Sequence, residues 1–177
     1  AIFSALYIIF CLRTVGLSPG LMGLTIAAGG VGALMGAAFA GWMARRLGVG
    51  PAILSAQVAV VVSVALIPLA PADPAAGMGV LVAAQLLGDS FGVAVFILAA
   101  SLRQSALPGA LLGRVGAAFK AMMGGLAVVG ALGGGLLGEQ VGVRGALMVA
   151  AAGFALAPLL GLPSPLRRLR EMPEEAA

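Results

Sequence analysis

The sequence contains no histidine, a single cysteine and only six acidic residues among its 177. These shortages exclude a disulfide within the chain, the usual Cys/His zinc sites and catalytic triads built on histidine. No phosphate-binding loop of the type Gly-x-x-x-x-Gly-Lys-Ser/Thr occurs either, so we do not expect this chain to hydrolyse ATP. We therefore expect neither an enzyme nor a bound metal or cofactor.

Charge of both signs is also scarce. Only 9% of the residues are charged and 62% are hydrophobic, whereas a soluble domain carries about 25% charged residues. A water-exposed surface therefore cannot be built from this composition. The ten basic residues could suggest nucleic-acid binding, but they lie in short clusters between apolar runs, as at the cytoplasmic ends of membrane helices. A membrane protein is predicted, with the lipid bilayer and not a nucleic acid as its surroundings.

A helix needs roughly 20 residues to span a membrane. Six apolar segments reach or approach this length. They cover residues 1–12, 21–44, 51–70, 76–102, 115–138 and 146–162. The runs are continuous, without the alternation typical of barrel strands, which favours helices. The first run is short and opens without methionine, so we expect the chain to be the C-terminal part of a longer polypeptide. Residues 1–163 then form one transmembrane domain and residues 164–177 a charged tail.

The segments between these runs differ in charge on the two sides of the predicted membrane. One side carries seven arginines, namely Arg45, Arg46, Arg103, Arg114, Arg167, Arg168 and Arg170. The other side carries Arg13 and Arg144, together with Asp73 and Glu139. Because basic residues are retained in the cytoplasm, the arginine-rich side is predicted to be cytoplasmic. Both ends of the chain would then lie inside the cell.

A weak internal repeat relates the second and fifth apolar segments. Residues 32–36 read Gly-Ala-Leu-Met-Gly and residues 130–134 read Gly-Ala-Leu-Gly-Gly. Two units of three helices would place the second unit upside down in the membrane, which is common in secondary transporters. The predicted fold is an all-α bundle of six transmembrane helices in two inverted three-helix repeats. Chance similarity between Gly/Ala-rich helices is the alternative.

A single carboxylate, Asp89, lies near the middle of the fourth apolar segment. Such a charge is costly in the membrane and usually faces a water-filled path or a partner. Gln85 is one helical turn earlier and shares its face, and Ser90 is adjacent. We interpret Asp89 and Gln85 as a site for a substrate or a coupling proton, with Ser90 a further candidate for lining it. An interhelical hydrogen bond that only fixes packing is the alternative.

Ser4, Tyr7 and Cys11 form a second polar stripe, three and then four residues apart in the first apolar segment. They could form another wall of the same cavity, or they could reflect ordinary packing of small residues. Lys120 interrupts the fifth segment near its cytoplasmic end, where its long side chain can reach the headgroups. Trp42, at the end of the second segment, is interpreted as an interfacial anchor.

Residues 41–48 read Gly-Trp-Met-Ala-Arg-Arg-Leu-Gly. Through Gly41, Arg45, Arg46 and Gly48 they resemble the cytoplasmic loop signature Gly-x-x-Ala-Asp-Arg-x-Gly. The sequence thereby resembles the C-terminal half of a major facilitator superfamily transporter. Arg45 stands where the signature has its carboxylate. A second series resembles bacterial exporters related to enterobactin and macrolide efflux permeases, through Arg103, Gln104, Pro108, Gly113 and Arg114.

This resemblance implies a twelve-helix protein of the bacterial inner membrane, of which the chain supplies helices seven to twelve. The partner would be an N-terminal six-helix half of the same polypeptide. The first and fourth segments, which carry the two polar stripes, would line the central cavity. The expected function is proton-coupled efflux of small amphipathic molecules by alternating access. A passive channel or facilitator, or a membrane scaffold without transport, are the alternatives.

Overall fold

A computed structural model describes residues 1–171, and all regular structure in that range is helical, with no strand. The elements in chain order are α1 (Ile2–Ile9), η1 (Phe10–Val15), α2 (Pro19–Leu47), α3 (Val49–Leu66), η2 (Ile67–Leu69), α4 (Pro74–Ser105), α5 (Gly109–Phe154), α6 (Leu156–Gly161) and η3 (Pro165–Arg168). The end of the predicted charged tail, residues 172–177, lies outside the described residues.

Four helical stretches are long and apolar enough to cross a membrane. They are Pro19–Leu47, Val49–Leu69, Pro74–Ser105 and Gly109–Gly161, and Ile2–Val15 is a shorter apolar helix. The chain therefore forms the helical bundle of a membrane protein, as its composition predicts. The count of six spans and the inverted repeat stay predictions.

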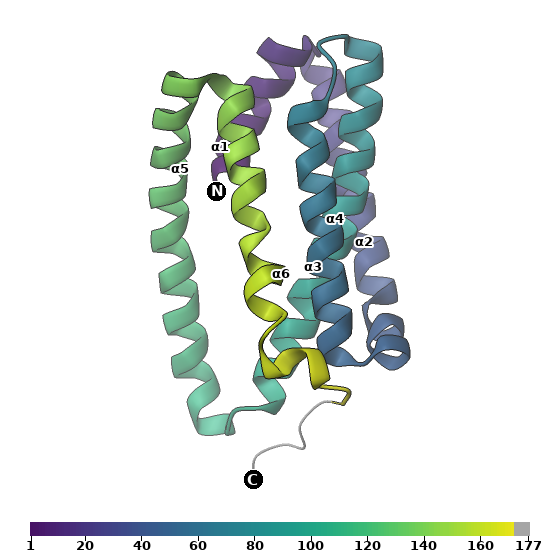
Figure 1. The fold of residues 1–177 in the computed structure, drawn as a ribbon, viewed down its shortest axis with the longest axis vertical. Helices are drawn as coiled ribbons and strands as arrows, with labels where there is room; N and C mark the ends of the chain where they lie inside the picture. The colour runs from purple at the N-terminus through teal and green to yellow at the C-terminus, as the bar shows by residue number, and fades with distance from the viewer. Residues whose placement is uncertain (172–177) are drawn as a thin grey trace.

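The longest of these stretches is divided at one residue. Gly142 within α5 has a φ of 75° and a ψ of 161°, which no helix contains. Figure 1 shows α5 running along one side of the bundle, reversing, and returning alongside it. The predicted connection between the fifth and sixth apolar segments is thus a break at a glycine, which tolerates this backbone conformation. The chain reverses there without a longer connecting loop.

Proline-containing turns set where two of the long helices begin. The Ser18 side chain accepts a hydrogen bond from the Leu21 N–H, and the Asp73 carboxylate accepts one of 2.8 Å from the Ala76 N–H. In both cases proline follows the capping residue at the first helical position, where its missing N–H costs nothing. Short polar turns in the sequence therefore determine the starts of α2 and α4.

Most residues predicted to lie in cytoplasmic loops instead belong to helix ends, which corrects the expected boundaries. Helical residues of this set are Gly41, Arg45 and Arg46 in α2, Arg103 and Gln104 in α4, and Gly113 and Arg114 in α5. Only Gly48 and Pro108 lie between helices. At the other end, the first helix continues through Arg13 to Val15 and ends at Gly16, whose φ is 80°. A helix satisfies its backbone hydrogen bonds in water as well as in lipid, so charged residues prolong it beyond the apolar run.

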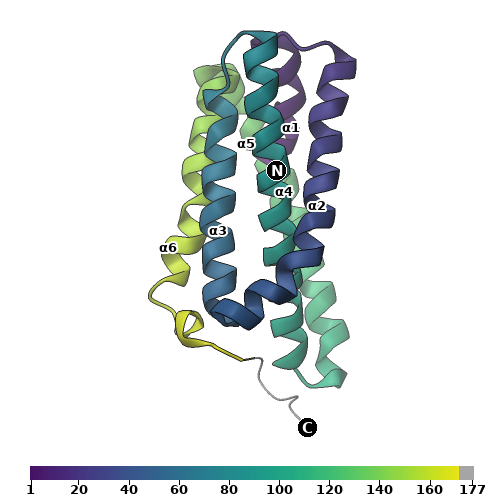
Figure 2. The same cartoon turned by 90° about the vertical axis from the view of Figure 1, so that its right-hand side faces the viewer.

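Glycines allow α4 to pack closely against α2. A Cβ atom built on Gly32 would overlap the backbone carbonyl oxygen of Leu86, and one on Gly36 would overlap that of Ser90. The two helices therefore approach until backbone meets backbone, as small residues permit in membranes. Figure 2 shows α4 between α2 and α3, at the centre of one side of the bundle.

Two clusters of buried side chains lie toward opposite ends of this bundle. One is built around Phe10, Leu81 and Leu147 and joins α1, η1, α4 and the second arm of α5. The other is built around Met43, Ile53 and Leu98 and joins α2, α3 and α4. The candidate site lies on the side of α4 that faces α1.

Arg144 joins three elements just after the break in α5. Its guanidinium donates hydrogen bonds of 2.8 Å to the carbonyl oxygens of Pro68 and Ala70, at the end of α3 and η2. It also lies 5.4 Å from the ring centre of Phe10. Since Pro68 and Ala70 are buried, their carbonyl groups depend on this arginine for a donor.

Arg144→Gln should therefore destabilise the chain by about 2–3 kcal/mol, because buried acceptors lose charged donors. The measurement is reversible unfolding in detergent micelles. Arg13→Gln is the matched control, since Arg13 is exposed at the same end of the bundle and should change stability little. Equal stabilities of the two variants would show that the two carbonyl contacts contribute nothing.

Candidate functional site

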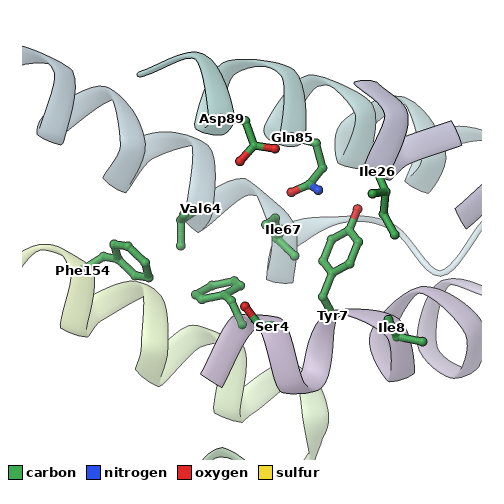
Figure 3. Close-up of a pocket in the computed structure, with 10 residues that line it drawn as sticks. Ser4, Tyr7, Ile8, Ile26, Val64, Ile67, Gln85, Asp89 and Phe154 are labelled. Carbon is green, nitrogen blue, oxygen red and sulfur yellow. The ribbon is translucent and has the colours of Figure 1, made fainter. Parts of the chain in front are cut away.

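The two polar residues predicted on α4 face a cavity of about 360 Å³ between α1, α2, α3 and α4. Gln85 and Asp89 are one turn apart and both line it (Figure 3). Asp89 is exposed to this space, and Gln85 is half-buried. A volume of this size lies within the range of small-molecule sites.

The wall opposite α4 comes from the short helix α1. Ser4 and Tyr7 lie on its cavity-facing side, three residues apart, together with Phe3 and Ile8. Figure 3 shows the Tyr7 ring rising from α1 toward Gln85. The structure thus brings four predicted residues from two segments around one space, with about 80 residues of chain between the two groups.

Tyr7 is held by a short chain of hydrogen bonds to α2. Its hydroxyl donates to Thr25 Oγ1 at 2.9 Å, and the Thr25 hydroxyl donates to the Met22 carbonyl oxygen at 2.7 Å. Thr25 is completely buried. Sequence reasoning missed Thr25, although a hydroxyl in the apolar run of residues 21–44 was a signal that could have drawn attention to it.

The remaining walls are apolar. Ile26 of α2, Val64 and Ile67 of the α3–η2 segment, and Phe154 at the end of α5 line the cavity. Phe3 and Phe154 pack edge to face, with ring centres 5.8 Å apart. The cavity is therefore amphipathic, with hydroxyl, amide and carboxylate groups on some walls and aliphatic and aromatic surface on others.

Gly29 of α2 makes room for the carboxylate. A Cβ atom at this position would overlap Asp89 Oδ2 and would lie 3.5 Å from Gln85 Nε2. No other glycine of the described chain has Asp89 as its nearest neighbour. Gly29 was not predicted as a site residue, although it precedes Gly32 and Gly36 at helical spacing on the face that packs against α4.

Among residues 1–171, no group donates a hydrogen bond to the Asp89 carboxylate and no cation forms an ion pair with it. None of the residues lining the cavity is basic. The carboxylate therefore does not neutralise an arginine or lysine of the described chain. An unpaired carboxylate in such a setting can take up a proton or accept a cationic group.

Two other candidates do not reach the cavity. Cys11 is fully buried within the cluster around Phe10, and Ser90 is buried and donates to the Leu86 carbonyl oxygen at 2.6 Å. Both are packing residues in this structure. Within the described part of the chain, no group of three or more His, Cys, Asp or Glu side chains could hold a metal ion.

The residues of the loop motifs form no part of this cavity. Gly48, Arg45 and Arg46 lie at the junction of α2 and α3, and Arg103 lies at the end of α4 with its guanidinium 4.7 Å from the Phe119 ring centre.

No family model, curated protein or solved structure matches this chain. Its function must therefore be argued from the residues and their geometry.

Proposed function

We propose that the chain is the C-terminal half of a secondary active transporter that exports small amphipathic molecules in exchange for protons. The observation that carries this proposal is the unpaired Asp89 carboxylate in an amphipathic cavity between α1 and α4. By the family resemblance, these are the helices that would line the central cavity. A polar site of this kind, within membrane helices, is typical of substrate and proton pathways.

The chemistry of the cavity favours an amphipathic cation as substrate. Asp89 supplies the single negative charge, and Gln85, Tyr7 and Ser4 supply polar contacts. Aromatic and aliphatic walls would hold the apolar part of the same molecule. Protonation of Asp89 from the outer side would remove its charge and release the cation, so that proton and substrate compete for one carboxylate.

Alternating access needs a second half, which would rock against this one around the cavity. We propose an N-terminal six-helix half of the same polypeptide as that partner. The excess of arginines at the end of the bundle that carries the α2–α3 junction supports the proposal that this end faces the cytoplasm of a bacterial inner membrane.

The proposal is tested by transport of ethidium, a fluorescent amphipathic cation, in cells that express the full-length gene. Export should stop when a protonophore dissipates the proton gradient, because no ATP-binding loop supplies another source of energy in this half. Export that continues down the dye gradient would identify a passive facilitator instead. No difference from cells without the gene, for ethidium and for neutral amphiphiles, would favour a scaffold.

A further inference from the structure

A second cavity, of about 440 Å³, lies at the junction of α2 and α3, far along the bundle from the Asp89 site. Arg45 and Arg46 line it from the last turn of α2, and Arg170 lines it from the segment that follows η3. Among the described residues, Glu171 is the one carboxylate on its wall. The proposed transport site has no part in this cavity.

The segment that carries Arg170 is docked to the junction by its backbone. The N–H groups of Val49 and Gly50 donate to the carbonyl oxygens of Arg170 and Leu169, at 3.2 and 2.8 Å. Arg170 Nη1 also donates to the Leu47 carbonyl oxygen at 3.1 Å. Leu169 packs against the buried cluster around Met43. The position of Arg170 is therefore built into the fold.

Two glycines of the junction permit this docking. Gly48 has a φ of 88°, and a Cβ atom there would lie 2.9 Å from Arg170 Cδ. A Cβ atom on Gly50 would overlap the Leu166 carbonyl oxygen. The close approach brings an arginine distant in sequence beside the two arginines of α2.

The described residues that line this cavity carry more positive than negative charge. Within residues 1–171, three arginines and one glutamate line it, and none of these arginines forms an ion pair. Guanidinium groups present fixed pairs of donors that match the oxygens of a phosphate. A phosphate group is therefore the anion that the cavity suits best.

Trp42 indicates where this phosphate comes from. It lies one helical turn before Arg45 and Arg46 on α2 and is 54% exposed. Exposed tryptophans of membrane helices favour the level of the headgroups, so the arginines lie beside the lipid phosphates. This position favours a lipid headgroup over a phosphate dissolved in water.

We propose that the cavity formed by Arg45, Arg46 and Arg170 binds the phosphate of an anionic lipid headgroup. The bound lipid bridges the end of α2 and the docked C-terminal segment. Basic residues near a membrane surface each contribute to the attraction of anionic lipids. Loss of one arginine should therefore weaken binding about fivefold.

The test is native mass spectrometry of the full-length protein in detergent, titrated with phosphatidylglycerol or with phosphatidylcholine. Wild type should retain one phosphatidylglycerol in preference to phosphatidylcholine, and R45Q/R46Q should lose that preference. This double variant leaves the Arg170 contacts intact, so loss of docking is not the cause. R114Q, which removes an arginine outside the cavity, is the control and should retain the lipid.

Two further results decide whether the bound phosphate belongs to a lipid and whether binding needs the paired donors of arginine. R45K/R46K keeps the charge but not the paired donors, and it should bind phosphatidylglycerol more weakly than wild type. Equal retention by wild type and R45Q/R46Q would overturn the proposal. Thermal stabilisation by inorganic phosphate that equals stabilisation by phosphatidylglycerol would overturn the lipid as the source.

Discussion

Asp89→Asn is expected to reduce proton-coupled export to the level of cells without the gene, while the protein still inserts and folds. Asparagine keeps the size of the side chain but neither titrates nor attracts a cation. The carboxylate has no hydrogen-bond or ion-pair partner in the described chain, so its removal breaks no such interaction there. Export is measured as ethidium efflux, and insertion as the amount of protein that elutes as one species in detergent.

Asp73→Asn is the matched control for this change. Asp73 caps the start of the same helix by accepting from the Ala76 N–H, and asparagine caps helices equally well. Its transport should equal that of wild type. Wild-type export by the Asp89 variant would refute the proposed role of the cavity.

Gly29→Ala tests the same site without changing its charge. The added methyl group would occupy the place of Asp89 Oδ2, so the carboxylate must rotate away from α2. We expect KM for the exported cation to rise, with the proton requirement retained. Gly30→Ala is the control, because nothing lies within 4 Å of a Cβ atom at Gly30.

Gly32→Ala is expected to destabilise the protein by about 1–3 kcal/mol, the usual cost of overpacking. Its methyl group would meet the carbonyl oxygen, the carbonyl carbon and the Cα atom of Leu86. These are backbone atoms, so α4 can accommodate the methyl group only by moving away from α2. Gly36→Ala should act in the same way against Ser90.

The control again is Gly30→Ala, two residues away on a free face of α2. This change should be neutral or stabilising by up to about 1 kcal/mol, because alanine favours a helix over glycine. Stability is measured by unfolding the purified protein with SDS in mixed micelles. If Gly32→Ala proves as stable as Gly30→Ala, the close crossing of α2 and α4 does not hold the bundle together.

The sequence predicted Ser4, Tyr7, Gln85 and Asp89 because polar groups in apolar helices are expensive and therefore rarely accidental. Helical spacing also placed Gln85 and Asp89 on one face. It gave the same prominence to Cys11 and Ser90, which the structure buries in packing. Spacing along one helix does not say which way its face points, and that direction depends on the neighbouring helices.

Thr25 and Gly29 are the opposite case, because both take part in the site but were not predicted from the sequence. Neither carries a charge, and each is one of many small residues in α2. Thr25 matters because Tyr7 reaches it from α1, and Gly29 matters because Asp89 reaches it from α4. Such roles exist only between helices, so a single sequence contains no signal strong enough to separate them from ordinary packing.

Composition and the continuity of the apolar runs together predicted a helical membrane protein. Only 9% of its residues are charged, and backbone groups in lipid must be satisfied within helices where no closed barrel is formed. The tertiary structure decided where the helices end, how α5 reverses at Gly142, and which polar residues meet. It also brought Arg170 to Arg45 and Arg46 across more than 120 residues. Hydrophobicity acts on each segment separately, whereas these arrangements depend on contacts between segments that the pattern of one segment does not encode.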